Sequence, residues 1–447
     1  MKRSLPVAVL LGLLAVTVGG VVVWSACSKT SSARPNVLVI VLDTLRADHL
    51  GVDGYERATS PNVDRFAREN LHFPRAFAAA PWTPPSIATL LSGLYPTSHG
   101  MMPPDKLPGE GDLSKRLDRN VLTLAEILAD SGYRTAALSA NPWITPEFGY
   151  AQGFETFDVR VDARAEKITE LGLARIEELR ASGDPFLFYL HYLDPHEPYS
   201  PPDDHRIFAG QPLRGSYSPQ MVENLDRYDG EIHYLDASLG RLFAELRAKG
   251  IYDDLVIVLL GDHGEQFEEH GHLGHGWQLF NEELRVPLVV KPGRTTQGRT
   301  IESVVSIVDV LPTILALTGQ EAPAAMQGVN LLDERALAAR RGVFAEIARR
   351  FSFRACVNAA GKKLIVELPW EDQGGDPQAP ARRLVGVFEA ASRDEPAIED
   401  TNLQRELEAE LQKMLDLVTR AKIAPSSDKV LPIDETIQRL RALGYAK

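Results

Sequence analysis

Cysteine is scarce in this sequence, and no metal-finger spacing or internal repeat is present. Its 447 residues include only two cysteines, Cys27 and Cys356. Two cysteines so far apart cannot form the paired short spacings of a zinc finger, and no segment recurs at a fixed period. The sequence therefore excludes a zinc-finger or solenoid architecture.

An excess of basic residues is also missing. The chain has 48 Lys and Arg against 61 Asp and Glu, which gives a formal net charge of −13. No basic stripe compensates for this charge, which argues against nucleic-acid binding. A small anionic substrate is compatible with it, provided that a metal ion and a few cationic side chains invert the field locally. The length predicts one large domain and a smaller one.

A long uncharged run stands at the N-terminus, where residues 5–24 follow Lys2 and Arg3. This pattern predicts an export signal or a membrane anchor. Residues 23–28, VWSACS, resemble the lipobox of bacterial lipoproteins, in which Cys27 would become the lipidated first residue. Trp24 departs from the aliphatic residue expected there, which leaves an uncleaved anchor as the alternative. We expect residues 1–34 to tether an exported protein to the membrane, in the periplasm or at the cell surface.

Three continuous apolar runs predict strands buried on both faces of a sheet. They span residues 36–42, 186–190 and 255–260, and such runs are typical of parallel sheets. Helical patterns lie between them, most clearly at residues 60–70, 121–131 and 219–249. The sequence therefore predicts an α/β domain over residues 35–320, with a large, mostly parallel central sheet flanked by helices.

The pattern changes beyond residue 320, where a small α+β subdomain is predicted over residues 321–447. Strands are expected at residues 342–348 and 363–368, with a segment rich in Pro and Gly at 369–380. Amphipathic helices are expected at residues 402–421 and 433–443. Cys356 lies in this region and is most simply a buried apolar residue. If Cys27 is lipidated, Cys356 has no partner for an internal disulfide.

Polar residues follow each of the three buried strands. Asp43 follows the first, His196 lies shortly after the second, and Asp262 and His263 follow the third. Because ligands gather beyond the carboxyl ends of parallel strands, we expect these side chains to meet. Carboxylate and imidazole ligands suit a divalent cation such as Mn²⁺, Zn²⁺ or, with less preference, Ca²⁺.

Residues 81–93, PWTPPSIATLLSG, predict a short helix that begins near Thr83. Prolines are favoured in a first helical turn, and a helix N-terminus stabilises an oxyanion through its dipole and free N–H donors. Thr83 is thus a candidate nucleophile if a metal ion lies beside it. The alternative is that Thr83 or Ser86 simply caps the helix.

Five motifs follow one another between residues 36 and 290: NVLVIVLDTLRADHLG, SPNVDRFARE, TPPSIATLLSGLYPTSHG, DPHEPY and GDHGEQFEEHGHLGHGWQLFNEELRVPLVV. Together they resemble the sulfatase family of the alkaline phosphatase superfamily. This resemblance implies the family's α/β fold, an anionic ester substrate and one divalent metal ion, and it implies that residues 321–447 form the family's second subdomain.

The resemblance assigns metal ligands residue by residue. Asp43 matches the first metal-binding aspartate, whereas Thr44 stands where a second aspartate is frequent. Asp262 and His263 match the later metal pair, with His263 in place of a frequent asparagine. Together with Thr83, these residues form the expected metal site.

The resemblance also assigns substrate contacts. His196 is expected to contact the ester oxygens or the leaving group, and His275 stands where a cationic residue, often lysine, binds substrate. His275 could act as an acid for the departing oxygen; the alternative for it and for His272 is a hydrogen-bonded loop histidine. Arg46 could neutralise substrate charge or pair with Asp48.

The nucleophile departs from the family pattern. Sulfatases of the usual kind carry Cys-x-Pro-x-Arg, whose cysteine becomes formylglycine, whereas residues 83–87 here read TPPSI. Threonine cannot give that aldehyde, so we expect no formylglycine. A threonine ester would have to be released by attack of water or of an acceptor, a mode established for phosphoryl chemistry.

We therefore predict a metal-dependent hydrolase that cleaves sulfate or phosphate and phosphonate esters through Thr83, with His196 and His275 binding and protonating the substrate. One alternative is a phosphoglycerol or phosphoethanolamine type of transferase acting on an envelope lipid or glycan. Another is a non-catalytic binding protein, which the clustered carboxylates disfavour because they would repel one another without a metal.

Overall fold

A computed structural model describes residues 34–101, 116–161, 163–213, 215–294, 297–348, 352–368, 383–392 and 394–426. The expectations for Cys27, for the N-terminal signal or anchor, for residues 369–380 and for a helix at residues 433–443 lie outside these ranges. Within them, no helix combines the length and the apolar character needed to cross a membrane. From Pro35 onward, the chain forms one compact unit.

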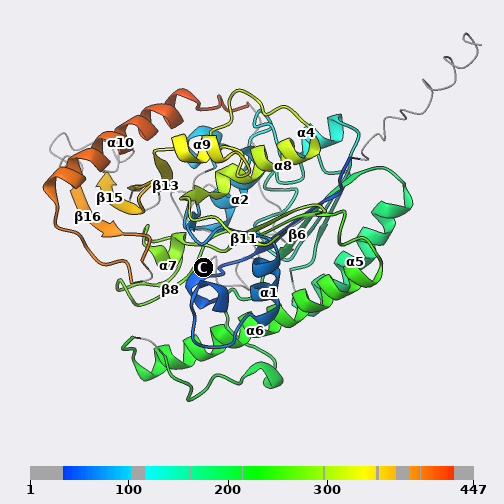
Figure 1. The fold of residues 1–447 in the computed structure, drawn as a ribbon, viewed down its shortest axis with the longest axis horizontal. Coiled ribbons are helices and arrows are strands. Elements are labelled where there is room, and N and C mark those ends of the chain that lie inside the picture. Colours follow the sequence, from blue (N-terminus) through cyan, green and yellow to red (C-terminus); the bar gives the residue numbers. More distant parts are fainter. Residues whose placement is uncertain are drawn as a thin grey trace, which may run out of the picture. The chain divides into compact units, whose positions relative to one another are not determined.

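An eight-stranded sheet forms the centre of this unit (Figure 1). β1, β4, β5, β6 and β7 run parallel, whereas β10 pairs with β7 in the antiparallel direction. The mostly parallel α/β sheet predicted from the sequence is thus confirmed. In spatial order the strands are β11 (Arg299–Thr300), β2 (Leu71–His72), β10 (Leu288–Pro292), β7 (Val256–Gly261), β1 (Val37–Leu42), β6 (Phe186–Tyr192), β4 (Arg134–Ser139) and β5 (Thr156–Val159).

Helices cover both faces of the sheet. Successive residues of a strand point to opposite sides, so an apolar strand presents apolar side chains to both layers of helices. Val37, Val39 and Val41 of β1 join one hydrophobic core, with α2 (Thr83–Ser92), α4 (Leu124–Asp130) and α8 (Val310–Thr318). The intervening residues of β1 join a second core, with α1 (Pro61–Glu69), α5 (Ala165–Ala181) and α6 (Pro219–Ala248). This double burial explains the uninterrupted apolar sequence of β1.

A four-stranded antiparallel sheet and a long helix form the C-terminal part. The strands are β13 (Gly342–Ala348), β14 (Ser352–Asn358), β15 (Lys362–Leu368) and β16 (Arg383–Glu389), in that order, and α10 (Thr401–Arg420) packs on them. Cys356 is buried there, as predicted, with no disulfide. The division at residue 320 stays a prediction.

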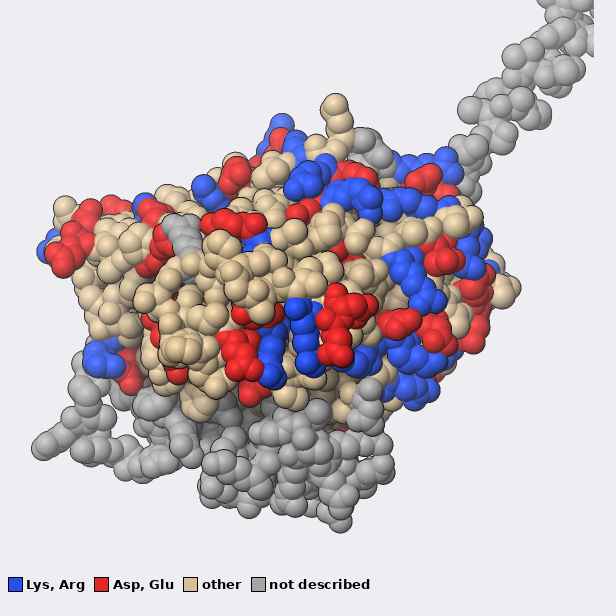
Figure 2. All heavy atoms as spheres, turned by 90° about the horizontal axis from the view of Figure 1, so that it is seen from below, with Lys and Arg blue, Asp and Glu red and all other residues tan. Residues whose placement is uncertain are grey.

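Short elements complete the described chain. α3 (Pro96–His99) follows α2, α7 (Asn281–Leu284) precedes β10, and α9 (Glu334–Ala339) precedes β13. β3 (Ala76–Phe77) pairs with β12 (Val305–Ser306), and β8 (Gln266–Phe267) pairs with β9 (Leu273–Gly274). On the face shown in Figure 2, acidic and basic side chains are interspersed.

Candidate active site

The central three strands bring the predicted residues to one edge of the sheet. β1 lies between β6 and β7, and Leu42 pairs in register with both Tyr192 and Gly261. The chain therefore leaves β1 and β7 side by side, which places Asp43 next to Asp262. Convergence of these two strand exits is what the sequence predicted.

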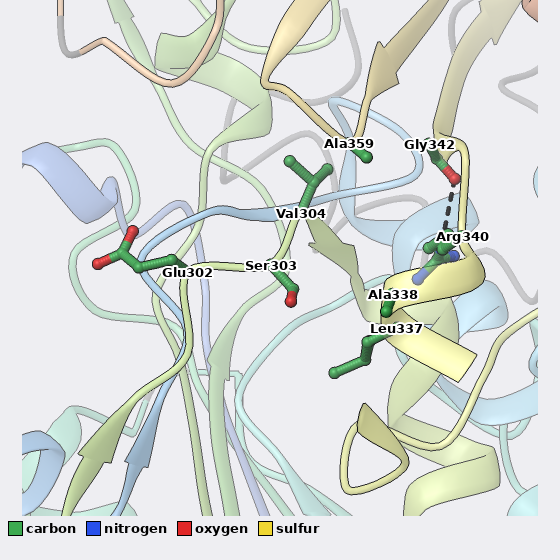
Figure 3. A pocket seen from close by; sticks show the side chains of 8 residues that line it. All are labelled: Glu302, Ser303, Val304, Leu337, Ala338, Arg340, Gly342 and Ala359. Carbon is green, nitrogen blue, oxygen red and sulfur yellow. Dashed lines mark hydrogen bonds between the residues drawn. The ribbon is translucent and has the colours of Figure 1, made fainter. Parts of the chain in front are cut away.

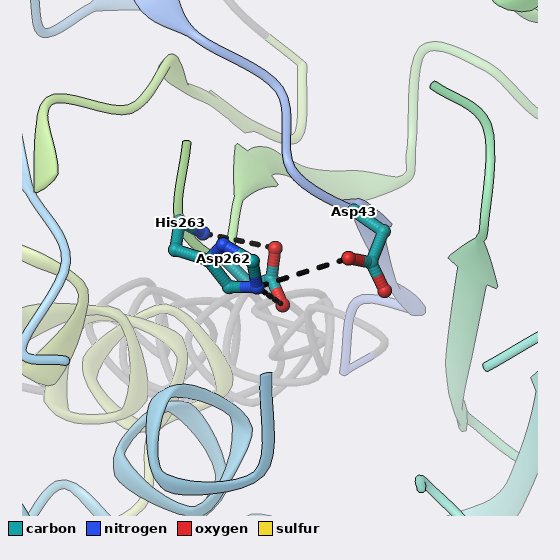
Figure 4. A group of neighbouring side chains, drawn as sticks. All are labelled: Asp43, Asp262 and His263. Atoms are coloured by element: carbon teal, nitrogen blue, oxygen red, sulfur yellow. Dashed lines mark hydrogen bonds and ion pairs between the residues drawn. The ribbon is translucent and has the colours of Figure 1, made fainter. Parts of the chain in front are cut away.

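Asp43, Asp262 and His263 form a buried group whose potential ligand atoms all lie within 4.8 Å of one another (Figure 4). His263 Nε2 is 3.8 Å from Asp43 Oδ1 and 3.5 Å from Asp262 Oδ2. Both of these carboxylate oxygens are buried and accept no hydrogen bond. Buried charged oxygens without partners are costly, and a divalent cation between them would satisfy both. The residues present thus fit a metal ion held by two oxygens and one nitrogen.

The other carboxylate oxygens are held by neighbouring groups. Asp43 Oδ2 lies 2.5 Å from the Asn141 Nδ2 that donates to it and 3.1 Å from His191 Nε2. Asp262 Oδ1 accepts hydrogen bonds from the backbone N–H of Thr44, at 3.2 Å, and from that of His263, at 2.9 Å. Each aspartate is thereby oriented with its second oxygen toward the other, which is how outer partners fix metal ligands.

A hydrogen bond and burial together determine the tautomer and the charge of His263. Its Nδ1 lies 2.9 Å from the carbonyl oxygen of Gly264, which can only accept, so Nδ1 carries the proton and Nε2 keeps its lone pair. Burial lowers the pKa of His263 to about 3, which keeps the ring neutral. Gly264 permits this turn because a Cβ there would lie 2.0 Å from the carbonyl oxygen of Glu282.

The two aspartates respond differently to burial. For Asp43, burial alone would raise the pKa, but the hydrogen bond from His191 and the nearby histidines outweigh it and hold the pKa below its ordinary value. For Asp262, burial and then the charge of Asp43 raise the pKa well above its ordinary value. Two ionised carboxylates therefore repel here unless a cation is present.

Thr83 is the first residue of α2, and its Oγ1 lies 3.0 Å from His263 Nε2. The N-cap position is Trp82, and no side chain caps the helix, so the capping alternative for Thr83 and Ser86 is excluded. Ser86 Oγ instead donates to the carbonyl oxygen of Asp262, at 2.5 Å. Tyr150 donates to the Pro84 carbonyl at 2.6 Å. These bonds hold the hydroxyl of Thr83 against the buried ligand group.

The expectation of several free N–H donors at the start of α2 is wrong. Pro84 and Pro85 have no N–H, and the N–H of Ser86 already donates to the carbonyl of Trp82, at 3.2 Å. The prolines that favour the helix start also remove its donors. The helix dipole remains, but stabilisation of a developing negative charge must come mainly from other groups.

His196 and His275 lie beside this group. The His275 ring centroid is 4.5 Å from that of His263 and 5.1 Å from that of His196. His196 Nδ1 lies 2.6 Å from the carbonyl oxygen of Glu197, so its Nε2 faces away from the main chain. Burial lowers the pKa of His196. The structure thus brings both histidines to the site where the sequence placed them.

Arg46 is buried and is engaged in ion pairs. Its guanidinium contacts Asp48 at 2.8 Å and Glu269 at 2.6 Å, and it donates to the carbonyl oxygen of Glu265 at 3.0 Å. The alternative of an ion pair with Asp48 is therefore present, and a direct contact of Arg46 with substrate stays a prediction. His272 stacks on Trp277 with an interplanar angle of 12°.

Sequence reasoning missed three residues of the site. His191 and Asn141 bind Asp43 Oδ2, and Glu265 Oε1 lies 3.0 Å from His275 Nδ1. Asn141 follows β4, so the strand-exit rule could have found it. His191 lies inside β6, where it reads as part of an apolar strand, and nothing in the sequence separates it from a core residue.

One hollow of the described surface is lined by none of the residues of the buried ligand group. It has a volume of about 350 Å³ and lies beside α9 and β13 (Figure 3). Its Arg340 donates to the Gly342 carbonyl at 3.0 Å and pairs with buried Asp309. That guanidinium is structural, and the lining residues include no group comparable to the one around Thr83. The lining consists of Glu302, Ser303, Val304, Leu337, Ala338, Arg340, Gly342 and Ala359.

The described chain thus combines a mostly parallel sheet with a buried Asp-Asp-His group and a hydroxyl at its carboxyl edge, which is where α/β proteins of this kind carry their sites. The family model described as Sulfatase matches residues 35–320. The chain belongs to the sulfatase family, and it is therefore an enzyme of the ester hydrolase class.

Three known proteins illustrate the range of this similarity. The low-salt glycan biosynthesis sulfotransferase Agl7 of Haloferax volcanii is 28% identical, covering 93% of this chain and 97% of its own. An arylsulfatase of Clostridium perfringens is 22% identical over 67% of this chain and 78% of its own. The structure of the phosphonate monoester hydrolase of Silicibacter pomeroyi superposes with a TM-score of 0.66 and 18% identity, over 87% of this chain and 96% of that one. The likeness to this solved structure shows that the two chains share a fold.

Proposed function

We propose that this protein is a metal-dependent hydrolase of sulfate or of phosphate and phosphonate esters that uses Thr83 as its nucleophile. The observation that carries the proposal is the contact of 3.0 Å between Thr83 Oγ1 and His263 Nε2, at a fully buried group of unsatisfied ligand atoms. A hydroxyl held this way is placed for activation, which a threonine needs because its ordinary pKa leaves it unreactive.

Asp43, Asp262 and His263 would hold the metal ion beside Thr83. Such an ion would supply positive charge that lowers the pKa of the Thr83 hydroxyl and stabilises charge on the ester oxygens. Its identity among Mn²⁺, Zn²⁺ and Ca²⁺ stays open, since the donors are two carboxylates and one imidazole.

The reaction proceeds by two displacements at sulfur or phosphorus. Thr83 Oγ1 loses its proton to solvent and bonds to the central atom while the bond to the leaving oxygen breaks. The leaving oxygen keeps the bonding pair and takes a proton from His275 or His196, which line the same buried group. Water then attacks the central atom, the bond from that atom to Thr83 Oγ1 breaks, and a proton of the attacking water passes to Thr83 Oγ1.

Transfer to an acceptor other than water is the second candidate. It uses the same threonine ester and differs only in the nucleophile of the second step. The coverage of 97% of a relative described as a glycan biosynthesis sulfotransferase favours this candidate, because the similarity extends through nearly all of that protein. An envelope lipid or glycan would be the acceptor.

We further propose that the enzyme is exported and tethered to the membrane through its N-terminal segment, with Cys27 as the lipidated residue. The support is the sequence of residues 1–34, in which two basic residues precede a long apolar run and a lipobox-like stretch.

A substrate panel tests the function. Wild type, Thr83→Ala and Thr83→Ser are assayed on aryl sulfates, phosphate monoesters and diesters, and phosphonate monoesters, each with Mn²⁺, Zn²⁺ and Ca²⁺. Turnover by wild type that disappears in Thr83→Ala supports the proposal. Equal rates for wild type and Thr83→Ala on every substrate would favour a non-catalytic binding protein. Added glycan or glycerol that raises leaving-group release without raising free sulfate or phosphate would identify a transferase.

A further inference from the structure

The β8–β9 hairpin brings Glu265 and His275 together. Gln266 pairs with Gly274 and Phe267 with Leu273. Glu265 immediately precedes β8 and His275 immediately follows β9, so the register places the two residues opposite each other at the open end of the hairpin. Gly274 and Gly276 flank His275 with φ of +90° and +79°. The chain bends on both sides of His275, and the hairpin register brings this residue next to Glu265.

The carboxyl group of Glu265 contacts the inner nitrogen of this ring. Glu265 is fully buried, and its Oε1 lies 3.0 Å from His275 Nδ1. Its main chain is also fixed, because its carbonyl oxygen accepts from Arg46 at 3.0 Å. Burial raises the pKa of Glu265 to about 7. In its ionised form Glu265 can only accept, so it holds a proton on Nδ1 of His275, and Nε2 lies on the opposite side of the ring. This arrangement resembles other histidines whose tautomer is set by a buried acid.

We propose that Glu265 is a positioning residue that keeps one proton of His275 on Nδ1, so that the doubly protonated ring directs its second proton, on Nε2, to the leaving oxygen. The inference rests on the proposed ester hydrolysis and deepens it. In this step the bond from sulfur or phosphorus to the leaving oxygen breaks, the oxygen keeps the electron pair, and the Nε2 proton moves to it. His275 is left neutral with its remaining proton on Nδ1, directed at Glu265.

A second buried acid holds the same loop in a different way. Glu283 is fully buried and accepts from the backbone N–H groups of Gly276, Trp277 and Gln278, at 2.6, 3.1 and 3.0 Å. It therefore fixes the main chain after His275, whereas Glu265 fixes the side chain of His275. The two acids lie in the same segment with equal burial, which makes Glu283 a matched control.

The proposal predicts a dependence on the leaving group. An alkoxide is a poor leaving group and needs a proton as the bond breaks, whereas 4-nitrophenolate leaves without one. Loss of a general acid costs on the order of 10²-fold or more where the proton is needed. We expect Glu265→Gln and Glu265→Ala to lower kcat on an alkyl ester by this factor. On the 4-nitrophenyl ester, the fold-decrease in kcat should be less than about a tenth as large.

A double-mutant cycle tests the connection to His275. Glu265→Ala is compared in wild type and in His275→Ala, with both esters and the metal ion that gives the highest wild-type rate. If Glu265 acts through His275, Glu265→Ala should not lower kcat on the alkyl ester any further in the His275→Ala background. Glu283→Gln should lower the melting temperature, and it should lower kcat on both esters by the same factor in either background.

The outcomes separate the inference from the function. An equal decrease in kcat on the two esters for Glu265→Gln would overturn the inference. A decrease caused by Glu265→Ala that is as large in the His275→Ala background as in wild type would also overturn it. In both cases, turnover by the wild type would still support the proposed function. Turnover that survives in Thr83→Ala would overturn the function itself. If Glu265→Ala does not fold, the tautomer of His275 is read from ¹⁵N chemical shifts in wild type and Glu265→Gln. A proton found on Nε2 alone in neutral wild-type His275 overturns the inference, and a proton on Nδ1 that shifts toward Nε2 in the variant supports it.

Discussion

Oγ1 of Thr83 lies 3.0 Å from Nε2 of His263, although the two residues are 180 positions apart in the chain. The contact joins the start of a helix to the exit of a strand. It places the hydroxyl of Thr83 against the buried ligand group, and every part of the proposed chemistry depends on it.

Removal of the Thr83 hydroxyl should abolish turnover. We expect Thr83→Ala to lower kcat on the order of 10³-fold or more, because nucleophile deletions leave only binding and electrostatic effects. Thr83→Ser should retain activity, since it keeps a hydroxyl. Thr89→Ala is the control: Thr89 lies in the same helix, and its hydroxyl donates to the Pro85 carbonyl at 3.0 Å, away from the ligand group. Intact mass after acid quench should show a sulfo or phospho adduct in wild type, and its absence under burst conditions would argue against the covalent step.

Metal binding should depend on Asp262. Its pKa is raised by burial and by Asp43, so ionisation of both acids destabilises the metal-free protein. Asp262→Asn should therefore raise the melting temperature of the metal-free protein, and it should abolish the further rise that added metal gives wild type. Elemental analysis should show lower metal content with parallel loss of activity. Asp236→Asn removes a buried carboxylate that accepts from the backbone N–H of Asn62 and Val63, and it should leave metal content unchanged.

Stability should fall as pH rises because of Glu231. Burial, together with Asp194, raises the pKa of Glu231 to about 7 from about 4.5. Between these values the folded state binds more protons at this site than the unfolded state, so the free energy of unfolding decreases with pH across that window. Glu231→Gln should remove on the order of 2 kcal/mol of this decrease between pH 4.5 and 8. Urea melts at several pH values measure it, and parallel pH profiles for wild type and variant would refute it.

A side chain at Gly264 should displace the turn that carries His263. A Cβ there would lie 2.0 Å from the Glu282 carbonyl oxygen, which is backbone and cannot simply rotate away. Gly264→Ala should cost about 1–3 kcal/mol of stability by overpacking. Metal affinity should drop at the same time. Gly54→Ala is a control for a glycine with open space around it, although its φ of +94° adds its own strain. A variant with full metal content and an unchanged melting temperature would contradict the prediction.

Membrane attachment should depend on Cys27. Cys27→Ser should abolish fatty-acid labelling of the protein in cells and release it from the membrane fraction, if the lipobox interpretation is right. Labelling or membrane association that survives the change would favour an uncleaved anchor instead. Cys356→Ser is the matched control, since Cys356 is buried and burial raises the pKa of its thiol to about 12.

Prediction from sequence succeeded where a pattern is local and repeated. The uninterrupted apolar character of β1, β6 and β7 identified buried parallel strands, and the polar residues after them identified the site. Prediction did not extend to β5, whose residues are half-buried or exposed, or to β14 and β16 of the second sheet. Strands of that kind lack a strong period and depend on partners that are distant in the sequence.

The sequence alone determined the resemblance to the sulfatase family, the buried strands β1, β6 and β7, and Thr83 as the candidate nucleophile. These are properties of single segments and can be read without knowing their neighbours. Tertiary structure alone decided that His191 and Asn141 orient Asp43, that Glu265 contacts His275, and that prolines leave the start of α2 poor in donors. The first two depend on strand register and loop packing, which bring side chains together across long distances in the chain. The third depends on the residue at which the helix begins, because only the actual first turn shows which N–H groups are absent.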